Sequence, residues 1–193
     1  MLRFVFSLFM ITLCFPSHVN AVQEVTKSGE VVDHITGLDI EDHFAYIEKI
    51  YTGDKPDMYI ISKFVQGYPT DSFILKNTIK TNRGTQEPHT VTLNKDQFIE
   101  SEKKRDYELY NSRIRHTLTN IKYLDDNVSA EVSYTSLYQG KMKKFIKGEG
   151  VVFLDFKSLS VCTNIMLFVD SKIKGKKANC TTEIIYGDPV TAK

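Results

Sequence analysis

Apolar residues along this chain recur first at helical spacing and later at strand spacing. Between residues 38 and 53 they fall every three or four positions, which is typical of one broad apolar helix face ending at Gly53. A turn at 54–57 separates this segment from a second helical segment that stops at 67–69. The apolar positions are Ile40, Phe44, Ile47 and Tyr51 in the first helix and Met58, Ile61, Phe64 and Val65 in the second. The pattern predicts a helical hairpin.

The remainder of the chain alternates apolar and polar residues in the manner of strands. Residues 71–81 predict one strand, and Asn94 is expected to cap a third helix in which Phe98 and Tyr107 pack. Four segments then predict an antiparallel meander, with turns expected at 125–127, 140–144, 155–158 and 170–172. The predicted strands of that meander are 113–124, 128–139, 145–156 and the final hairpin 161–186.

Helices that precede a run of strands predict an α+β fold. We expect a cone-shaped, strongly curved antiparallel sheet covered on one face by three N-terminal helices. Gly148 and Gly150 mark a bend in one strand. Such an arrangement leaves a cavity between the helices and the sheet.

The N-terminus carries the pattern of a secretory signal. Arg3 precedes an apolar run too short to span a bilayer, and Ala21 closes a cleavage pattern. The expected organisation is a signal peptide at 1–21, a lead-in segment at 22–37, a single domain at 38–187 and a tail at 188–193. We therefore expect an exported protein, periplasmic or secreted, with no transmembrane segment in the mature chain.

Charge argues against nucleic acid as a partner. Removing residues 1–21 takes away one of the 25 Lys and Arg residues, which leaves 24 cations against 24 acids. A neutral chain lacks the electrostatic attraction that bulk binding to nucleic acid requires. No histidine spacing indicates a metal site and no phosphate-binding loop is present, so no metal and no cofactor are expected.

Two cysteines remain in the mature chain, Cys162 and Cys180. If a three-residue loop joins their strands, Val169 faces Ile173 and the two cysteines face each other directly. A two-residue loop would leave them diagonal. In an exported protein we expect a disulfide between neighbouring strands.

The helical hairpin from Tyr46 to Phe64, followed by strand, helix and meander, resembles the nuclear transport factor two-like superfamily, also called cystatin-like or SnoaL-like. The resemblance implies a cone that hosts isomerases, dehydratases, hydrolases, transport adaptors and secretion-system subunits. Tyr46 falls where the ketosteroid isomerase of that superfamily has its first-helix tyrosine. The strand position that should supply its carboxylate base holds Lys76 or Asn77, so that proton transfer would lack its base.

These observations favour an exported, non-catalytic binding domain. It would hold a small apolar ligand in the cone, or dock a protein partner on the sheet face or hairpin tips as a secretion or envelope component does. A homodimer through the sheet face is compatible with both. The alternative is a small-molecule isomerase, dehydratase or hydrolase that uses Tyr46. The pocket-lining candidates are Tyr46, Tyr59, Phe64, Phe73, His116 and Tyr134.

Lysines cluster at two predicted hairpin tips. Because successive tips of a meander alternate between the two ends of a sheet, we expect both lysine-rich tips to lie together, opposite the acidic tip at 125–127. They would form a basic surface that keeps exposed hairpins soluble or, in the functional interpretation, binds an acidic partner or an anionic surface. Its residues are Lys141, Lys143, Lys144, Lys172, Lys174, Lys176 and Lys177.

Overall fold

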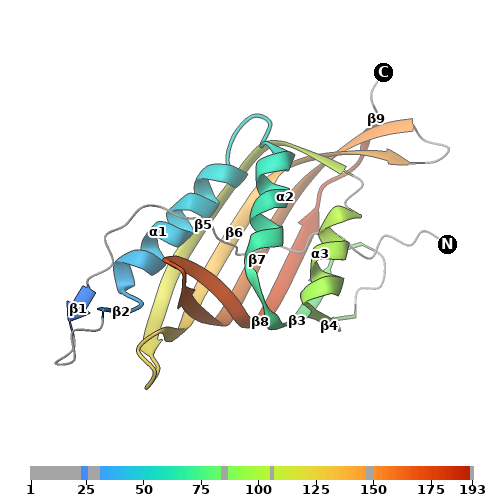
Figure 1. The fold of residues 1–193 in the computed structure, drawn as a ribbon. Helices are drawn as coiled ribbons and strands as arrows, with labels where there is room; N and C mark the ends of the chain where they lie inside the picture. Colours follow the sequence, from blue (N-terminus) through green and yellow to red (C-terminus); the bar gives the residue numbers. More distant parts are fainter. Residues whose placement is uncertain (1–22, 26–30, 84–86, 105–106, 147–149, 192–193) are drawn as a thin grey trace.

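Three helices pack on one face of a strongly curved sheet (Figure 1). The computed structural model describes residues 23–25, 31–83, 87–104, 107–146 and 150–191. The predicted signal peptide and its cleavage site lie outside the described residues. The helices are α1 (Gly37–Tyr51), α2 (Met58–Gly67) and α3 (Lys95–Lys103). The predicted α+β architecture, with three helices on one face, is confirmed.

Each helix begins at a side chain that satisfies its first backbone N–H groups. Thr36 caps α1 and forms a capping box with Asp39, whose N–H donates to Thr36 Oγ1 over 3.2 Å. Asp57 caps α2, and Asn94 caps α3 in a second capping box with Gln97. The prediction of Asn94 as a cap is confirmed.

The strands form one large mixed sheet and one small ribbon. Strands β1 (Gln23–Val25) and β2 (Val31–Asp33) pair with each other, within the predicted lead-in. The large sheet has the order β4-β3-β8-β7-β6-β5, and β9 pairs with β7. Its strands are β3 (Pro69–Thr81), β4 (His89–Asn94), β5 (Tyr107–Tyr123), β6 (Ser129–Ile146), β7 (Gly150–Val169), β8 (Lys172–Tyr186) and β9 (Val190–Thr191). Strands β3 and β8 are parallel, so the sheet is not wholly antiparallel as predicted.

Two predicted turns of the meander do not exist. Strand β6 runs through 140–144 and strand β7 runs through 155–158, and the two stay paired from Ser129 opposite Leu167 to Ile146 opposite Gly150. Polar residues and Gly140 suggested breaks there, but both strands have one solvent-facing side on which such residues are at home. Strand β5 likewise begins six residues earlier than predicted, and Tyr107 is its first residue rather than part of α3.

The missing turn overturns the predicted charge separation. Lys141, Lys143 and Lys144 lie inside β6. The turn predicted at 170–172 has only two residues, Asp170–Ser171, and the four lysines that follow it lie in β8. Because one connection between β6 and β7 replaces the two predicted turns, the β7–β8 turn lies at the same end of the sheet as the acidic tip at 125–127. The N–H of Phe168 donates to Val128 O over 2.7 Å, and the pKa of Asp126 is lowered by its hydrogen bond from Ser129 and also by the charge of Lys176. Lysines and acids therefore meet at this end.

Alternate residues of each strand face the helices and form the core. On β7 the even-numbered residues from Val152 to Phe168 are buried, as are Tyr134 and Tyr138 on β6 and Phe73 on β3. We call this helix-covered side the inner face. The opposite, outer face exposes Leu159, Val161 and Ile185 among charged residues. Among the described residues, no helix covers it.

Candidate functional site

A row of buried polar side chains crosses the inner face. His116 on β5 pairs with Ser136 on β6, Ser136 with Ser160 on β7, and Ser160 with Thr182 on β8. Asn77 on β3 completes the row by accepting a hydrogen bond from Thr182. All these side chains are buried. We call them the inner polar row. Buried polar side chains are costly unless hydrogen bonded, so the partners of each decide its role.

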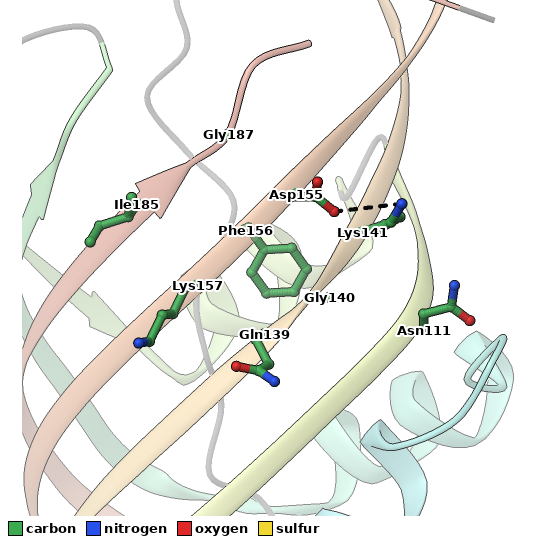
Figure 2. A pocket seen from close by; sticks show the side chains of 9 residues that line it. All are labelled: Asn111, Gln139, Gly140, Lys141, Asp155, Phe156, Lys157, Ile185 and Gly187. Atoms are coloured by element: carbon green, nitrogen blue, oxygen red, sulfur yellow. Dashed lines mark ion pairs between the residues drawn. The ribbon is translucent and has the colours of Figure 1, made fainter. Parts of the chain in front are cut away.

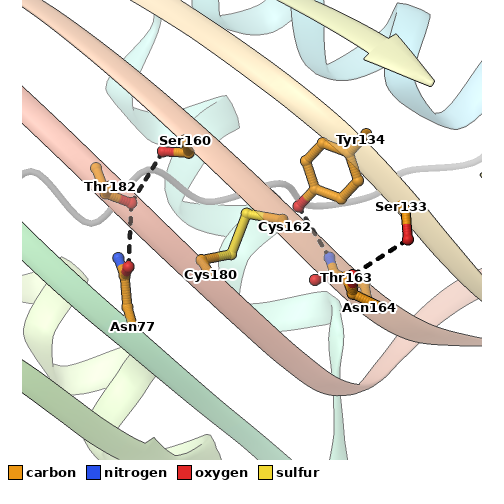
Figure 3. Close-up of a disulfide and its surroundings, with 9 residues drawn as sticks. All are labelled: Asn77, Ser133, Tyr134, Ser160, Cys162, Thr163, Asn164, Cys180 and Thr182. Atoms are coloured by element: carbon orange, nitrogen blue, oxygen red, sulfur yellow. Dashed lines mark hydrogen bonds between the residues drawn. A yellow bond between two sulfur atoms is a disulfide. The ribbon is translucent and has the colours of Figure 1, made fainter. Parts of the chain in front are cut away.

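The half of the row on β7, β8 and β3 is closed by its own hydrogen bonds (Figure 3). Ser160 Oγ lies 2.9 Å from Thr182 Oγ1, which donates to Asn77 Oδ1 over 3.1 Å. Since Thr182 donates to Asn77, it accepts from Ser160. Each hydroxyl in this half has a partner, and the chain of three groups ties β7, β8 and β3 together. Asn77, where the resemblance expects a base, therefore has a structural role.

A disulfide between Cys162 and Cys180 lies beside this closed half (Figure 3). The two residues are directly opposite each other, with their Cα atoms 4.2 Å apart, so the predicted disulfide is confirmed. The predicted three-residue loop is wrong: Val169 pairs with Lys172 across a two-residue turn. A one-residue bulge between Ile165 and Met166 then shifts the register back and brings the cysteines opposite each other.

The half of the row on β5 and β6 is open. Ser136 Oγ and His116 Nε2 have no hydrogen-bond partner among the described residues, and the nearest partner of His116 Nδ1 is the carboxylate of Glu48, 3.4 Å away. Ser158 Oγ, one row away on β7, also has no partner among the described residues. Three polar atoms are thus buried on neighbouring strands without an internal partner. Each would cost about 1–3 kcal/mol unless another molecule satisfied it.

Glu48 on α1 is the charged group nearest His116. Its Oε1 accepts a hydrogen bond of 2.5 Å from the backbone N–H of His116 and lies 3.4 Å from ring Nδ1. Burial lowers the pKa of His116 more than Glu48 raises it. The hydrogen bond from His116 in turn lowers the pKa of Glu48, against the opposing effect of burial. At neutral pH the pair therefore consists of a neutral imidazole and a carboxylate.

Aromatic rings surround the imidazole. The ring of Phe44 lies 4.8 Å from that of His116, and the ring of Tyr134 lies 5.9 Å from it. Tyr134 OH accepts a 3.0 Å hydrogen bond from Asn164 Nδ2. His43, one turn before Ile47 on α1, stacks on Tyr68, and burial together with the nearby charge of His116 lowers its pKa to about 3. Both histidines are thus uncharged at neutral pH.

The structure brings most of the predicted pocket-lining residues to the helix-covered interior. Phe64, Phe73 and Tyr134 are buried, and the side chain of His116 is 1% exposed. Tyr46 is half-buried, packs against Phe64 and has its pKa raised by burial. Tyr59 differs: it is 70% exposed on α2, beside Lys63, and lies outside the interior.

The sequence prediction missed Glu48, Ser136 and Ser158. The serines occupy buried positions of strands that were otherwise read as apolar on that side, and this was the available signal. Glu48 supplies a carboxylate from α1 rather than from β3, and only the packing of α1 on β5 brings it to His116. Among the described residues, no group of His, Cys, Asp and Glu could hold a metal ion, and no helix is long and apolar enough to span a membrane.

No protein-family model matches the sequence, and no curated protein sequence matches it. Two solved structures are similar in fold. One is an NTF2-like protein of unknown function from Prochlorococcus sp. NATL2A, with a TM-score of 0.47 and 16% identity over 76% of this chain and 93% of that chain. The other is a hexachlorocyclohexane dehydrochlorinase (LinA) type 2, with a TM-score of 0.42 and 14% identity over 81% of this chain and 88% of that chain. At such identity the likeness concerns the fold alone.

Proposed function

We propose that this domain binds a small polar molecule on the inner face, against His116 and Ser136. The observation that supports this most is the set of buried polar atoms that no other described residue satisfies. Proteins rarely bury such atoms unless a ligand, water or catalytic role accounts for them. Their clustering on β5, β6 and β7 favours a shared partner over unrelated defects.

The lining indicates the chemistry of the ligand. A neutral imidazole offers one donor and one acceptor, and each serine hydroxyl offers both. Phe44 and Tyr134 add apolar ring surfaces beside His116. These groups suit a small uncharged molecule with hydroxyl or carbonyl groups on an apolar frame. The purely apolar ligand expected from the sequence would leave His116 and Ser136 unpaired.

The seam between α1 and β5 is the proposed access route. The side chain of Glu48 contacts His116 yet remains 36% exposed, so it connects the buried site with solvent. Tyr46 is half-buried on the same helix. A ligand that enters beside Glu48 would meet the imidazole first.

Proton transfer is a second candidate function, favoured by the Glu48–His116 pair. A carboxylate near Nδ1 favours the tautomer with its proton on that nitrogen, which leaves the Nε2 lone pair as an acceptor. A neutral buried histidine held in this way is suited to act as a general base in an isomerisation or elimination. In this reading the base is His116, and Tyr46 is not required.

Replacement of His116 by leucine tests the proposal. Native mass spectrometry of the purified protein should show a bound small molecule, and the His116→Leu protein should lose it. Because His116 Nε2 is buried without an internal partner, the same variant should melt at a temperature no lower than that of the wild type. Ligand binding that survives the substitution would contradict the assignment, whether or not the variant unfolds more easily.

We also propose that the protein is exported. The N-terminal pattern and a disulfide on the inner face support this, since disulfides persist in oxidising compartments. N-terminal sequencing of protein from the envelope or medium should give Val22 as the first residue. Retention of Met1 would contradict export through this signal.

A further inference from the structure

The outer face carries a separate concave site. A shallow pocket of about 370 Å³ lies where β6 and β7 bend, on the side of the sheet away from the helices (Figure 2). Gln139 and Lys141 on β6, Asp155 and Lys157 on β7, and Ile185 on β8 contribute to its lining. We call it the outer pocket. Since it lies across the sheet from His116, it is independent of the function proposed above.

The backbone of β5 and β6 is closely packed beside the pocket. A bulge in β5 places Asn111 in the left-handed region, with φ of 46°, and brings Ser112 close to Gly140. A Cβ at position 140 would lie 2.8 Å from Ser112 Cα, so glycine is required there. Gly53 forms two backbone hydrogen bonds of 2.9 Å with Ser112. Ser112 is buried and does not line the pocket, so this contact lies behind the pocket and not in it.

Three cations surround Gln139 on this face. Arg113 and Lys157 are its register partners on β5 and β7, and Lys141 is two residues along β6. Lys141 lies 3.8 Å from Asp155, whereas Arg113 and Lys157 form no ion pair among the described residues. The side chains of Gln139 and Lys157 project on the same side of the sheet in Figure 2. The pocket thus has an excess of positive charge and an amide donor at its centre.

Apolar side chains continue from this charged end. Ile185 pairs with Lys157, and the next row places half-buried Leu137 beside Leu159, which is 46% exposed. Val161, two residues further along β7, is 56% exposed. From Lys157 to Val161 the apolar path measures about 13 Å along the strand. A ligand with a charged end and an apolar chain would match both parts.

We propose that the outer pocket binds a single-chain amphiphile with an anionic head group, such as a carboxylate. The head group lies over Gln139 and receives charge-assisted hydrogen bonds from Arg113 and Lys157. The chain lies on Leu159 and Val161 and covers apolar surface that is otherwise in water. Positive charge beside exposed apolar surface is the complementarity that selects this ligand over a neutral or cationic one.

Titration of the full-length secreted protein with decanoate below its micelle concentration tests the proposal. Amide NMR shifts should map to β6 and β7 around Gln139 and Leu159. Decanol and decyltrimethylammonium should bind at least about tenfold more weakly, and hexanoate should be weaker than decanoate.

The double variant Arg113→Gln/Lys157→Gln should weaken decanoate binding about tenfold or more at low salt. The control is Lys63→Gln, which removes an exposed lysine of α2 on the other side of the sheet.

Four results would overturn the proposal. Decanol could bind as tightly as decanoate, or the double variant could bind decanoate as tightly as wild type. Binding to anionic phosphatidylglycerol vesicles without any binding of monomeric decanoate would indicate a membrane surface instead. Light scattering that showed a stable dimer, lost on Val161→Asp, would indicate that a second copy covers this face. The His116→Leu variant should bind decanoate normally, so a failure here is separable from a failure of the inner site.

Discussion

The two halves of the inner polar row use the same kinds of side chain in different ways. On β7, β8 and β3, Ser160, Thr182 and Asn77 satisfy one another next to a disulfide. On β5 and β6, His116 Nε2 and Ser136 Oγ have no hydrogen-bond partner among the described residues. The first half stabilises the sheet. The second half lowers the free energy of unfolding, and a bound molecule that satisfied its polar atoms would raise it again. Buried polarity alone therefore does not identify a functional site, whereas unsatisfied polarity points to one.

Acidification should have the largest effect and should act through His43, whose pKa also responds to His116 of the open half. His43 has its pKa lowered to about 3 in the folded protein, so the unfolded chain binds a proton first as pH falls below about 6.5. Stability should then decrease by about 1.4 kcal/mol per pH unit until the folded-state pKa is reached. Urea denaturation at pH 7, 6, 5 and 4 measures this slope. In His43→Phe the slope should be smaller, and an unchanged slope would show that carboxylates alone cause it.

Removal of the disulfide should have the next largest effect and should weaken the closed half. Replacing Cys162 and Cys180 by alanine opens a loop whose ends are 18 residues apart, which should cost about 3 kcal/mol of stability. Ligand binding to the inner site of the folded variant should persist, because β6 and β7 lie between His116 on β5 and Cys180 on β8. Chemical denaturation gives the first quantity and native mass spectrometry the second. Loss of the ligand from a folded variant would erase the distinction between the halves.

Asn77→Ala should cost about 2 kcal/mol, because it leaves the buried hydroxyl of Thr182 without its acceptor. Thr78→Ala is the matched control: Thr78 is the next residue of β3, and its hydroxyl pairs with Thr90 at 2.9 Å on the exposed side. Its cost should be below about 1 kcal/mol. If both variants lost the same stability in thermal or urea denaturation, the buried hydrogen bond would contribute no more than the exposed one.

The smallest effect gives the sharpest comparison. Ser160→Ala removes a satisfied hydroxyl and should destabilise by about 1 kcal/mol. Ser136→Ala, at the paired position on the neighbouring strand, removes an unsatisfied one and should be neutral or slightly stabilising. Parallel denaturation curves suffice to compare them. If Ser136→Ala destabilised the protein and Ser160→Ala did not, the hydroxyl of Ser136 would have a hydrogen-bond partner inside the protein.

The sequence predicted the element order well and the strand register less well. Amphipathic spacing located α1 and α2, and Asn94 as a cap located α3. The predicted register was wrong where it depended on the length of a turn: the β7–β8 turn has two residues instead of three. The disulfide was predicted correctly although its loop was wrong, because the short Asp170–Ser171 turn and the bulge near Met166 cancel. Both turn residues have positive φ, which only the structure reveals.

The candidate site was predictable only in part, for a physical reason. His116 and Tyr134 could be proposed because bulky aromatic residues on the buried side of a strand must line an interior. Glu48 looked like an ordinary surface carboxylate of α1, and its role depends on how that helix packs on β5. Whether Ser136 or Ser160 has a partner depends on neighbours from distant parts of the chain. No local pattern contains that information.

The end of α2 is locked to β8 by a contact between a ring and a backbone. Gly175 N donates to Tyr68 O over 3.1 Å, and Lys174 Nζ donates to Gly67 O. A Cβ on residue 175 would overlap the Tyr68 ring, which is buried against Phe73 and His43. These two positions can therefore change only as a pair. In a family of related chains, any member with a side chain at 175 should carry a much smaller residue than tyrosine at 68, so the two columns of an alignment should covary.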